Sequence, residues 1–383
     1  MRILFLSNQL PGSHSAYDTR LDGLRLGLAA CGAQTGWTSL RQMRFARPHL
    51  LFPLNGPHIA RLAQGYDVIH AGGTGAALAA CVARQWGGPP VVYDVHGDEV
   101  QESLLRWQAR RSVKSAYVLL QARLISAPAR HCADHLLMVS RPFFVRYQNE
   151  KYIDPSRMSL VLNGVDTKTF HPAADYVARA DGRTHICYAG SFQSWQAVDE
   201  LVAAFQQIST ADVYFHIIGF DPTRNADQQL KAQISDTLGA QVTCLDWLTK
   251  ADLIRYLQYM DVLIIPRTTH PAMRGGLPSK FAEYLALGKP LIVTSVDDTA
   301  LYVRQHDCGI VCEPDADSMA DALRTSLRLT PSEQALLGSN ARNLAKNLFD
   351  WRVIARDYLD TLHTLIQQNS SHRKSKQGRR THA

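Results

Sequence analysis

The chain has 383 residues, 46% of them hydrophobic and 20% charged, which is typical of a globular protein and long enough for two domains. No apolar run approaches the roughly 20 residues that a membrane-spanning helix needs, so the sequence does not predict an integral membrane protein. The formal net charge is +7, but five basic residues and no acid follow Asn369, which leaves the body of the chain nearly neutral.

The cysteines indicate a reducing compartment. Seven are scattered through mostly apolar segments, an odd number that does not suggest a disulfide framework. Only Cys308 and Cys312 are close together, and no second pair joins them, so no zinc site is predicted. The N-terminal segment "MRILFLSNQLPG" has too short an apolar stretch for a signal peptide. We therefore expect a cytoplasmic protein.

The first half of the chain alternates short apolar runs with helical patterns, such as the one from Ala76 to Trp86. This alternation predicts parallel strands joined by crossover helices. The predicted strands are 2–7, 66–70, 90–95 and 135–140. The turn-rich stretch "VLNGVDTKTFHP" near residue 163 then interrupts the pattern.

After this interruption the alternation restarts and ends in a mostly helical segment, 331–368. Strands are predicted at 184–190, 213–219, 241–247, 261–266 and 289–295. The predicted fold class is therefore α/β, with two Rossmann-like, doubly wound domains facing a cleft and a boundary at 163–180. Such sheets bind ligands at the carboxyl ends of their strands, so we expect the chemistry in that cleft.

The stretch "GGLPSKFAEYLALGKPLI", 275–292, has the pattern of a glycine-rich turn that opens a helix. A helix N-terminus favours phosphate, and glycines let a ligand approach the backbone. Lys280 would add a charge against a diphosphate, and Glu283 would accept hydrogen bonds from a ribose diol. The alternative is a solvated ion pair three residues apart on an ordinary helix.

Two other loops are predicted at the same strand ends. Gly190 and Ser191 follow the strand 184–190 in "YAGSF", a second turn suited to phosphate. Arg267, His270 and Arg274 follow the strand 261–266, where they would converge with Lys280. A solvated basic loop is the alternative interpretation.

Together these stretches resemble a GT-B glycosyltransferase of family 4 over roughly residues 1–367. The N-G-V-D…F-x-P string and the G-L-P-x-K-x-x-E-Y run are fairly specific together. They occur in the family's order with the stretches "MRILFLSNQLPG", "DVIHAGG", "VVYDVHGDE", "ADHLLMVS", "YAGSF" and "DVLIIPR". The resemblance implies an acceptor-binding domain over 1–165, a nucleotide-sugar-binding domain over 166–350 and a helix, 351–368, that crosses back to the first domain. The composition of 369–383 predicts a disordered basic tail.

The resemblance also assigns site residues. Glu283 matches the glutamate that holds the ribose hydroxyls, and Gly190 and Ser191 match the turn beside the diphosphate. His96 matches a histidine near the donor sugar, although a strand-end histidine with a local hydrogen bond is the plainer interpretation. The backbone facing the donor phosphate and sugar corresponds to Gly276, Leu277, Pro278 and Ser279.

Two departures from the family pattern affect the donor site. Gly275 stands where many members have a first glutamate, and Gln196 stands where others have a lysine. We therefore assign the cation of the donor diphosphate to Lys280, with Arg267 and Arg274 next. The predicted catalytic residues are His96, Lys280 and Arg267. No metal site is predicted, because no Asp-x-Asp cluster lies near the donor site.

The resemblance implies retaining transfer of a hexose-type sugar from a UDP-sugar or GDP-sugar, with no cofactor besides this donor. The acceptor would be a glycan or lipid-linked saccharide in cell-envelope or exopolysaccharide biosynthesis. The acceptor hydroxyl would attack from the front face, and the departing phosphate oxygen would take its proton. The protein would then supply positioning and charge stabilisation rather than a nucleophile.

The region 103–133 contains no acidic residue and interleaves basic residues with Trp107 and Tyr117. As one continuous helix it would place Arg106, Arg110 and Lys114 on one face, suited to an anionic membrane surface. A solvated face is the alternative. The basic tail would add to the attraction and place the protein at the inner face of the membrane. No nucleic-acid-binding motif is present.

Two other function classes fit parts of the sequence. An NAD-dependent oxidoreductase would use the glycines of "DVIHAGGTGAALAA", with Asp94 about twenty residues later. However, Leu78 stands where the third glycine of that fingerprint belongs. A non-catalytic GT-B protein is the second alternative, suggested by Gln196 and Gly275.

Overall fold

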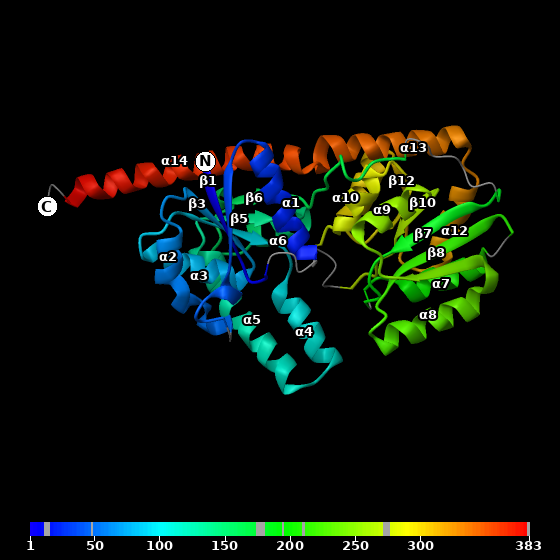
Figure 1. The fold of residues 1–383 in the computed structure, drawn as a ribbon, viewed down its shortest axis with the longest axis horizontal. Coiled ribbons are helices and arrows are strands. Elements are labelled where there is room, and N and C mark those ends of the chain that lie inside the picture. The colour runs from blue at the N-terminus through cyan, green and yellow to red at the C-terminus, as the bar shows by residue number, and fades with distance from the viewer. Residues whose placement is uncertain are drawn as a thin grey trace. The chain divides into compact units, whose positions relative to one another are not determined.

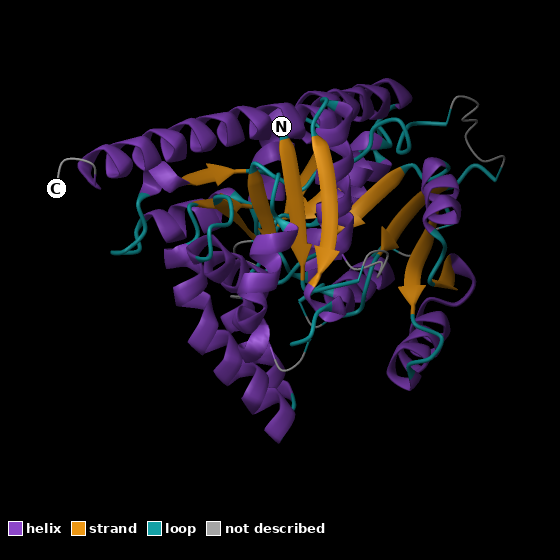
Figure 2. Ribbon diagram, turned by 60° about the vertical axis from the view of Figure 1, so that its left-hand side comes forward, coloured by secondary structure: helices purple, strands orange, loops and turns teal. Residues whose placement is uncertain are grey.

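The computed structural model describes residues 1–10, 16–46, 49–173, 181–193, 195–208, 211–270 and 276–380. The chain forms two compact units (Figure 1). The first comprises Met1–Gly164 and Trp351–Ala383, and the second comprises Val165–Asp350. Each contains one six-stranded parallel sheet with helices packed against it, which confirms the predicted Rossmann-like class (Figure 2).

The sheet of the first unit has the order β2-β1-β3-β4-β5-β6. Its strands are β1 Arg2–Ser7, β2 Gln34–Ser39, β3 Val68–Gly72, β4 Val91–Val95, β5 His135–Met138 and β6 Met158–Leu160. The helices are α1 Ala16–Ala30, α2 Gly56–Leu62, α3 Thr74–Gln85, α4 Glu99–Ala109, α5 Val113–Cys132, α6 Arg141–Gln148 and α14 Trp351–Arg380. Strand order reverses between β1 and β3, as in doubly wound sheets.

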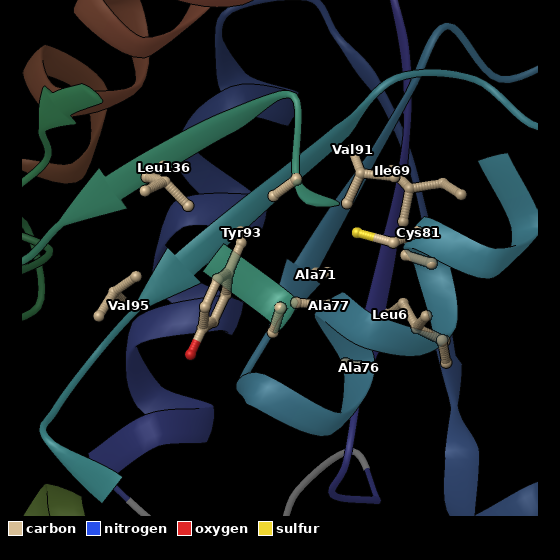
Figure 3. Packing of buried hydrophobic residues seen from close by; sticks show 14 of the residues in the cluster. Leu6, Ile69, Ala71, Ala76, Ala77, Cys81, Val91, Tyr93, Val95 and Leu136 are labelled. Carbon is tan, nitrogen blue, oxygen red and sulfur yellow. The ribbon is translucent and has the colours of Figure 1, made fainter. Parts of the chain in front are cut away.

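Small residues let α3 lie close against this sheet. Its buried side chains include Ala76, Ala77 and Cys81, and they pack toward Ile69 and Tyr93 of β3 and β4 (Figure 3). Alanines have no rotamers to lose and allow close approach of helix to strand, so the apolar β-strand residues are covered at little entropic cost.

The sheet of the second unit has the order β12-β11-β10-β7-β8-β9. Its strands are β7 Thr184–Ala189, β8 Val213–Phe220, β9 Val242–Asp246, β10 Val262–Ile265, β11 Leu291–Thr294 and β12 Gly309–Cys312. The helices are α7 Val198–Gln207, α8 Asn225–Leu238, α9 Lys250–Gln258, α10 Ser279–Ala286, α11 Asp298–His306, α12 Ala316–Leu327 and α13 Pro331–Leu344. Order reverses between β7 and β10, so ligand binding is expected at the carboxyl ends of these two strands.

All nine strands predicted from apolar runs are present, and three others were not predicted. These three, β2, β6 and β12, are all edge strands. β2 reads QTGWTS and is only partly buried along most of its length, and β6 has only the three residues MSL, so neither has the apolar run of a strand covered on both faces. β12 was missed although its residues, GIVC, are apolar.

The region 103–133 is not one helix, so the predicted common face of Arg106, Arg110 and Lys114 is wrong. α4 ends at Ala109 and α5 begins at Val113. Ser112 caps α5 through a reciprocal pair of hydrogen bonds with Ser115. This capping box stabilises a new helix start without any glycine or proline to mark the break.

The last helix, α14, continues to Arg380, beyond residue 368 where we expected it to end. The tail contains five lysines and arginines and no proline, and lysine and arginine favour a helix once one has begun. Within the described ranges, no helix is both long and apolar enough to cross a bilayer.

Candidate active site

The turn after β7 is held in place by two buried tyrosines. The hydroxyl of Tyr188 donates to the carbonyl of Ser191 at 2.6 Å. The hydroxyl of Tyr284, on α10, bonds both the amide and the carbonyl of Ala189 at 3.1 Å. These bonds fix Gly190 and Ser191 beside the start of α10.

Gly190 has a backbone φ of +158°, and it also lies close to the side chain of Lys280. A Cβ atom here would collide with the ammonium group of Lys280, and one at Gly219 would collide with the carbonyl of Gly190. The two glycines therefore allow the ends of β7 and β8 and the Lys280 side chain to share one small space.

The N-terminus of α10 faces this turn with backbone donors available. Pro278 occupies the cap position and has no side-chain hydrogen bond to offer. The amides of Ser279 and Lys280 make no hydrogen bond within the described part of the chain. Uncapped donors at a positive helix end suit an anion such as a phosphate.

Lys280 places its charge at the same point. Its ammonium nitrogen is buried, has no hydrogen-bond partner in the described residues, and lies 4.6 Å from the ring centroid of Tyr188. Burial, with the nearby charge of Arg267 adding to it, lowers the pKa of Lys280 to about 7. A buried amine without a partner is unfavourable in the free protein and is relieved by an anionic ligand.

Glu283 lies one turn further along α10 and is partly buried. Burial raises the pKa of this carboxyl, while the charges of Lys250 and Lys280 oppose the rise. Its carboxylate makes no ion pair or hydrogen bond with the residues that the structure describes. It is therefore available to accept hydrogen bonds from ligand hydroxyls.

Arg267 is held by contacts within its own unit. Its guanidinium forms an ion pair with Asp297 and donates to the carbonyl of Gly276 at 2.6 Å. Its backbone is tied to Thr294 by two hydrogen bonds of 2.9 Å. Because its charge is already matched by a buried carboxylate, Arg267 holds the Gly276 segment in place.

The remaining predicted donor residues are placed as follows. Leu277 is buried, and Pro278 and Ser279 are partly buried. Arg274 and Gly275 lie outside the described residues. Gln196, which stands in place of the family lysine, has a buried side-chain oxygen with no partner in the described residues.

His96 belongs to the first unit, at the end of β4, while all other predicted site residues belong to the second. Burial, with the charge of Arg20 adding to it, lowers the pKa of His96 to about 4, so the imidazole is neutral near pH 7. Its proximity to the donor sugar stays a prediction.

A buried charge network supports the strand that ends at His96. Asp94 accepts two hydrogen bonds of 2.8 Å from Arg20, and His70 lies 3.6 Å away and bonds Tyr358 of α14 at 2.8 Å. Burial raises the pKa of Asp94, but the neighbouring Arg20 guanidinium more than offsets this and holds the pKa well below its usual range. The network joins α1, β3, β4 and α14.

Sequence reasoning missed the residues that support the site. Tyr188, Tyr284 and Asp297 looked like ordinary core or loop residues, because their roles depend on neighbours that are remote in sequence. Gly219 did carry a signal, since a glycine at the end of an apolar strand often marks close backbone approach.

Comparison with known proteins decides the family. Residues 35–169 match the family model described as Glycosyltransferase Family 4, and residues 183–328 match the one described as Glycosyl transferases group 1. The chain belongs to family 4 of the GT-B glycosyltransferases. This is a family of retaining enzymes that depend on nucleotide sugars.

The glycosyltransferase is 25% identical over 299 residues to UDP-Gal:alpha-D-GlcNAc-diphosphoundecaprenol alpha-1,3-galactosyltransferase of Escherichia coli, covering 74% of this chain and 72% of that protein. Other curated relatives are D-inositol 3-phosphate glycosyltransferases, of whose length the matches span between 43% and 66%.

Solved structures agree on the fold. Sucrose-phosphate synthase from Thermosynechococcus elongatus superposes with a TM-score of 0.74 at 20% identity, covering 96% of this chain and 99% of that one. HepE from Anabaena, solved with UDP and glucose, superposes with a TM-score of 0.70 at 16% identity, covering 95% and 100%. In the described part of the glycosyltransferase, no group of three or more side chains is arranged to hold a metal ion. Metal independence stays a prediction.

Proposed function

We propose that this glycosyltransferase moves a hexose-type sugar, with retention, from a UDP-sugar or GDP-sugar to a lipid-linked saccharide in cell-envelope or exopolysaccharide biosynthesis. The main support for a nucleotide-sugar donor is the buried ammonium of Lys280. It has no hydrogen-bond partner in the described residues and lies beside the uncapped start of α10. A cation, two free amides and a glycine turn together suit a diphosphate.

The same arrangement supports a role for each residue. Lys280 and the amides of Ser279 and Lys280 stabilise the negative charge that grows on the diphosphate as it leaves. Glu283, three residues along the helix, accepts hydrogen bonds from the ribose diol. Arg267 keeps the Gly276 segment in position through its bond to the Gly276 carbonyl. The departing phosphate oxygen takes the proton of the acceptor hydroxyl, so no protein nucleophile is needed.

Relatives support the choice of donor and acceptor. The E. coli relative is named for UDP-Gal and a diphosphoundecaprenol-linked acceptor, and the HepE structure was solved with UDP. A lipid-linked acceptor would bring the glycosyltransferase to the inner face of the membrane, as a peripheral protein. The basic tail would strengthen that attraction; its side chains after Asn369 lie outside those described.

The donor site is tested by calorimetric titration of UDP, GDP, ADP and NAD into the purified protein and its Lys280→Met variant. One nucleoside diphosphate should bind, and the variant should bind it about 10- to 100-fold more weakly, the range expected for a charge-assisted contact. Affinity for the matching nucleoside should change much less, because it has no phosphate.

Lys289→Met is the matched control. Lys289 is also buried, and burial lowers its pKa to about 8. It precedes β11 and so lies at the amino ends of the parallel strands, whereas the proposed site lies at their carboxyl ends. This variant should bind the nucleotide normally. The assigned site would be refuted if the two lysine variants lost nucleotide affinity equally, or if the protein bound NAD alone. Binding of sugar nucleotide without hydrolysis or transfer to any lipid-linked acceptor would support the non-catalytic alternative.

A further inference from the structure

α4 and α5 form an antiparallel hairpin that projects beyond the sheet of the first unit (Figure 1). The two helices meet at a short turn, 110–112, between Ala109 and Val113. One side of α5 is already covered, because Leu119, Ala122, Ile125 and Ala129 are buried. The other side is therefore not needed to hold the unit together.

That other side carries a continuous apolar row. The exposed fractions are 90% for Val113, 41% for Tyr117, 53% for Leu120 and 54% for Leu124. These residues are spaced by four, three and four positions, which places them on one face of the helix. Single exposed apolar residues are ordinary on protein surfaces, but an aligned row from the tip to the middle of a helix marks an interaction surface.

Basic side chains surround this row. Exposed arginines and a lysine lie at the tip and alongside it: Arg106, Arg110, Arg111, Lys114 and Arg123. No acidic residue occurs between 103 and 133. The nearest acid on the hairpin, Glu102, lies at its base, where it pairs with Arg106 at 3.5 Å. The outer part of the hairpin is thus uniformly positive.

We propose that the α4–α5 hairpin docks the protein onto a bilayer that contains anionic lipid. Val113, Tyr117, Leu120 and Leu124 enter the boundary between headgroups and acyl chains, and the basic side chains contact lipid phosphates. An amphipathic helix with an apolar face and a basic border binds such an interface both by burying apolar area and by electrostatic attraction to anionic lipids. Tyr117 is suited to the headgroup level, because its ring is apolar and its hydroxyl is polar.

The charge pattern favours a lipid surface over a protein partner. An apolar row flanked only by positive charge matches a surface that is uniformly negative over a large area. The long lysine and arginine stems can lie along the apolar layer while their charged ends reach the phosphates. The proposal rests on the proposed function in that a lipid-linked acceptor explains why docking is useful, but it is testable without any acceptor.

Sedimentation with vesicles measures this docking directly. Vesicles of phosphatidylcholine alone are compared with vesicles containing about one third phosphatidylglycerol, using the full chain. The protein should partition strongly to the anionic vesicles and weakly to the neutral ones. Each basic residue near an anionic surface is expected to contribute about fivefold, so Arg110→Gln/Arg111→Gln/Lys114→Gln should lower partitioning roughly 100-fold.

The apolar row is tested by Val113→Ser/Tyr117→Ser/Leu120→Ser/Leu124→Ser, which should lower partitioning by about 10- to 100-fold. Leu336→Ser is the matched control, since Leu336 is 56% exposed on α13 of the second unit, and it should change nothing. Nucleotide binding should be unchanged in all these variants. Vesicle partitioning thus tests membrane docking and nucleotide titration tests the donor site, so failure of either proposal can be recognised without the other.

Three results would overturn the proposal. The first is no difference between anionic and neutral vesicles. The second is equal partitioning by the wild type and the apolar-row variant. The third is a concentration-dependent dimer in sedimentation velocity that the apolar-row variant abolishes while vesicle binding persists, which would assign the row to a second copy of the chain.

Discussion

Nucleotide binding should depend on pH through Lys280. The free protein holds this amine with a pKa lowered to about 7 by burial and the charge of Arg267. A bound diphosphate would favour the charged form and raise the pKa again, so binding takes up a proton wherever the free amine is neutral. Affinity must then fall as the pH rises above the pKa of the free protein.

The magnitude follows from the protonated fraction. With a pKa of about 7, about half of the free protein carries the charge at pH 7 and about one hundredth at pH 9, so affinity for UDP or GDP should fall about 50-fold across that range. Titrations should stay above about pH 7, because a terminal phosphate itself takes up a proton near pH 6.

The assay is calorimetric titration at several pH values in buffers of different ionisation enthalpy, which also counts the protons taken up. Lys280→Met should bind weakly with no such pH dependence, and Lys289→Met should follow the wild type. The assignment of the proton to Lys280 would be refuted if nucleotide affinity of the wild type did not change with pH, or if affinity of Lys280→Met fell equally steeply.

Three further predictions concern neighbouring residues. Glu283→Gln should weaken nucleoside and nucleoside diphosphate alike, by about 10- to 100-fold in titrations, because it removes a charged acceptor from ribose rather than from phosphate; a loss confined to the diphosphate would contradict this role. Gly190→Ala should displace the Lys280 ammonium, lowering the free energy of unfolding by about 1–3 kcal/mol in urea and abolishing most nucleotide binding; wild-type affinity would show that the space is not as tight as described. Asp94→Asn leaves Arg20 buried without its counter-charge and should cost about 3–5 kcal/mol at neutral pH. Because the pKa of Asp94 is depressed on folding, this difference should be full above about pH 4 and shrink as the pH falls, and a constant difference down to pH 2 would argue against the ion pair.

The sequence predicted the central strands well because both faces of a central parallel strand are covered, which leaves an apolar run such as LIVT in β11. The edge strands β2 and β6 lack such a run and were missed, whereas β12 was missed although its residues, GIVC, are apolar. The break between α4 and α5 was missed for another reason: a serine pair caps α5, and neither Gly nor Pro marks the turn.

The site was only partly accessible to sequence reasoning. Gly190, Lys280 and Glu283 were predicted because each follows a predicted strand or lies in the first turns of a predicted helix. Their local pattern alone was enough to suggest phosphate and ribose contacts. The partner of Arg267 was not accessible, because Asp297 comes from a loop 30 positions away and only the folded sheet brings the two together.

The path of the chain gives the second unit two neighbouring ends. Val165 and Asp350 form a bridge, and the amide of Val165 donates to the carbonyl of Phe349 at 2.8 Å. The second unit is thus an insertion that leaves and rejoins the first unit between Gly164 and Trp351. Two adjacent cuts would release it whole. The corresponding segment of another family member, spliced at the same two junctions, is therefore expected to exchange the second unit while keeping the first unit unchanged.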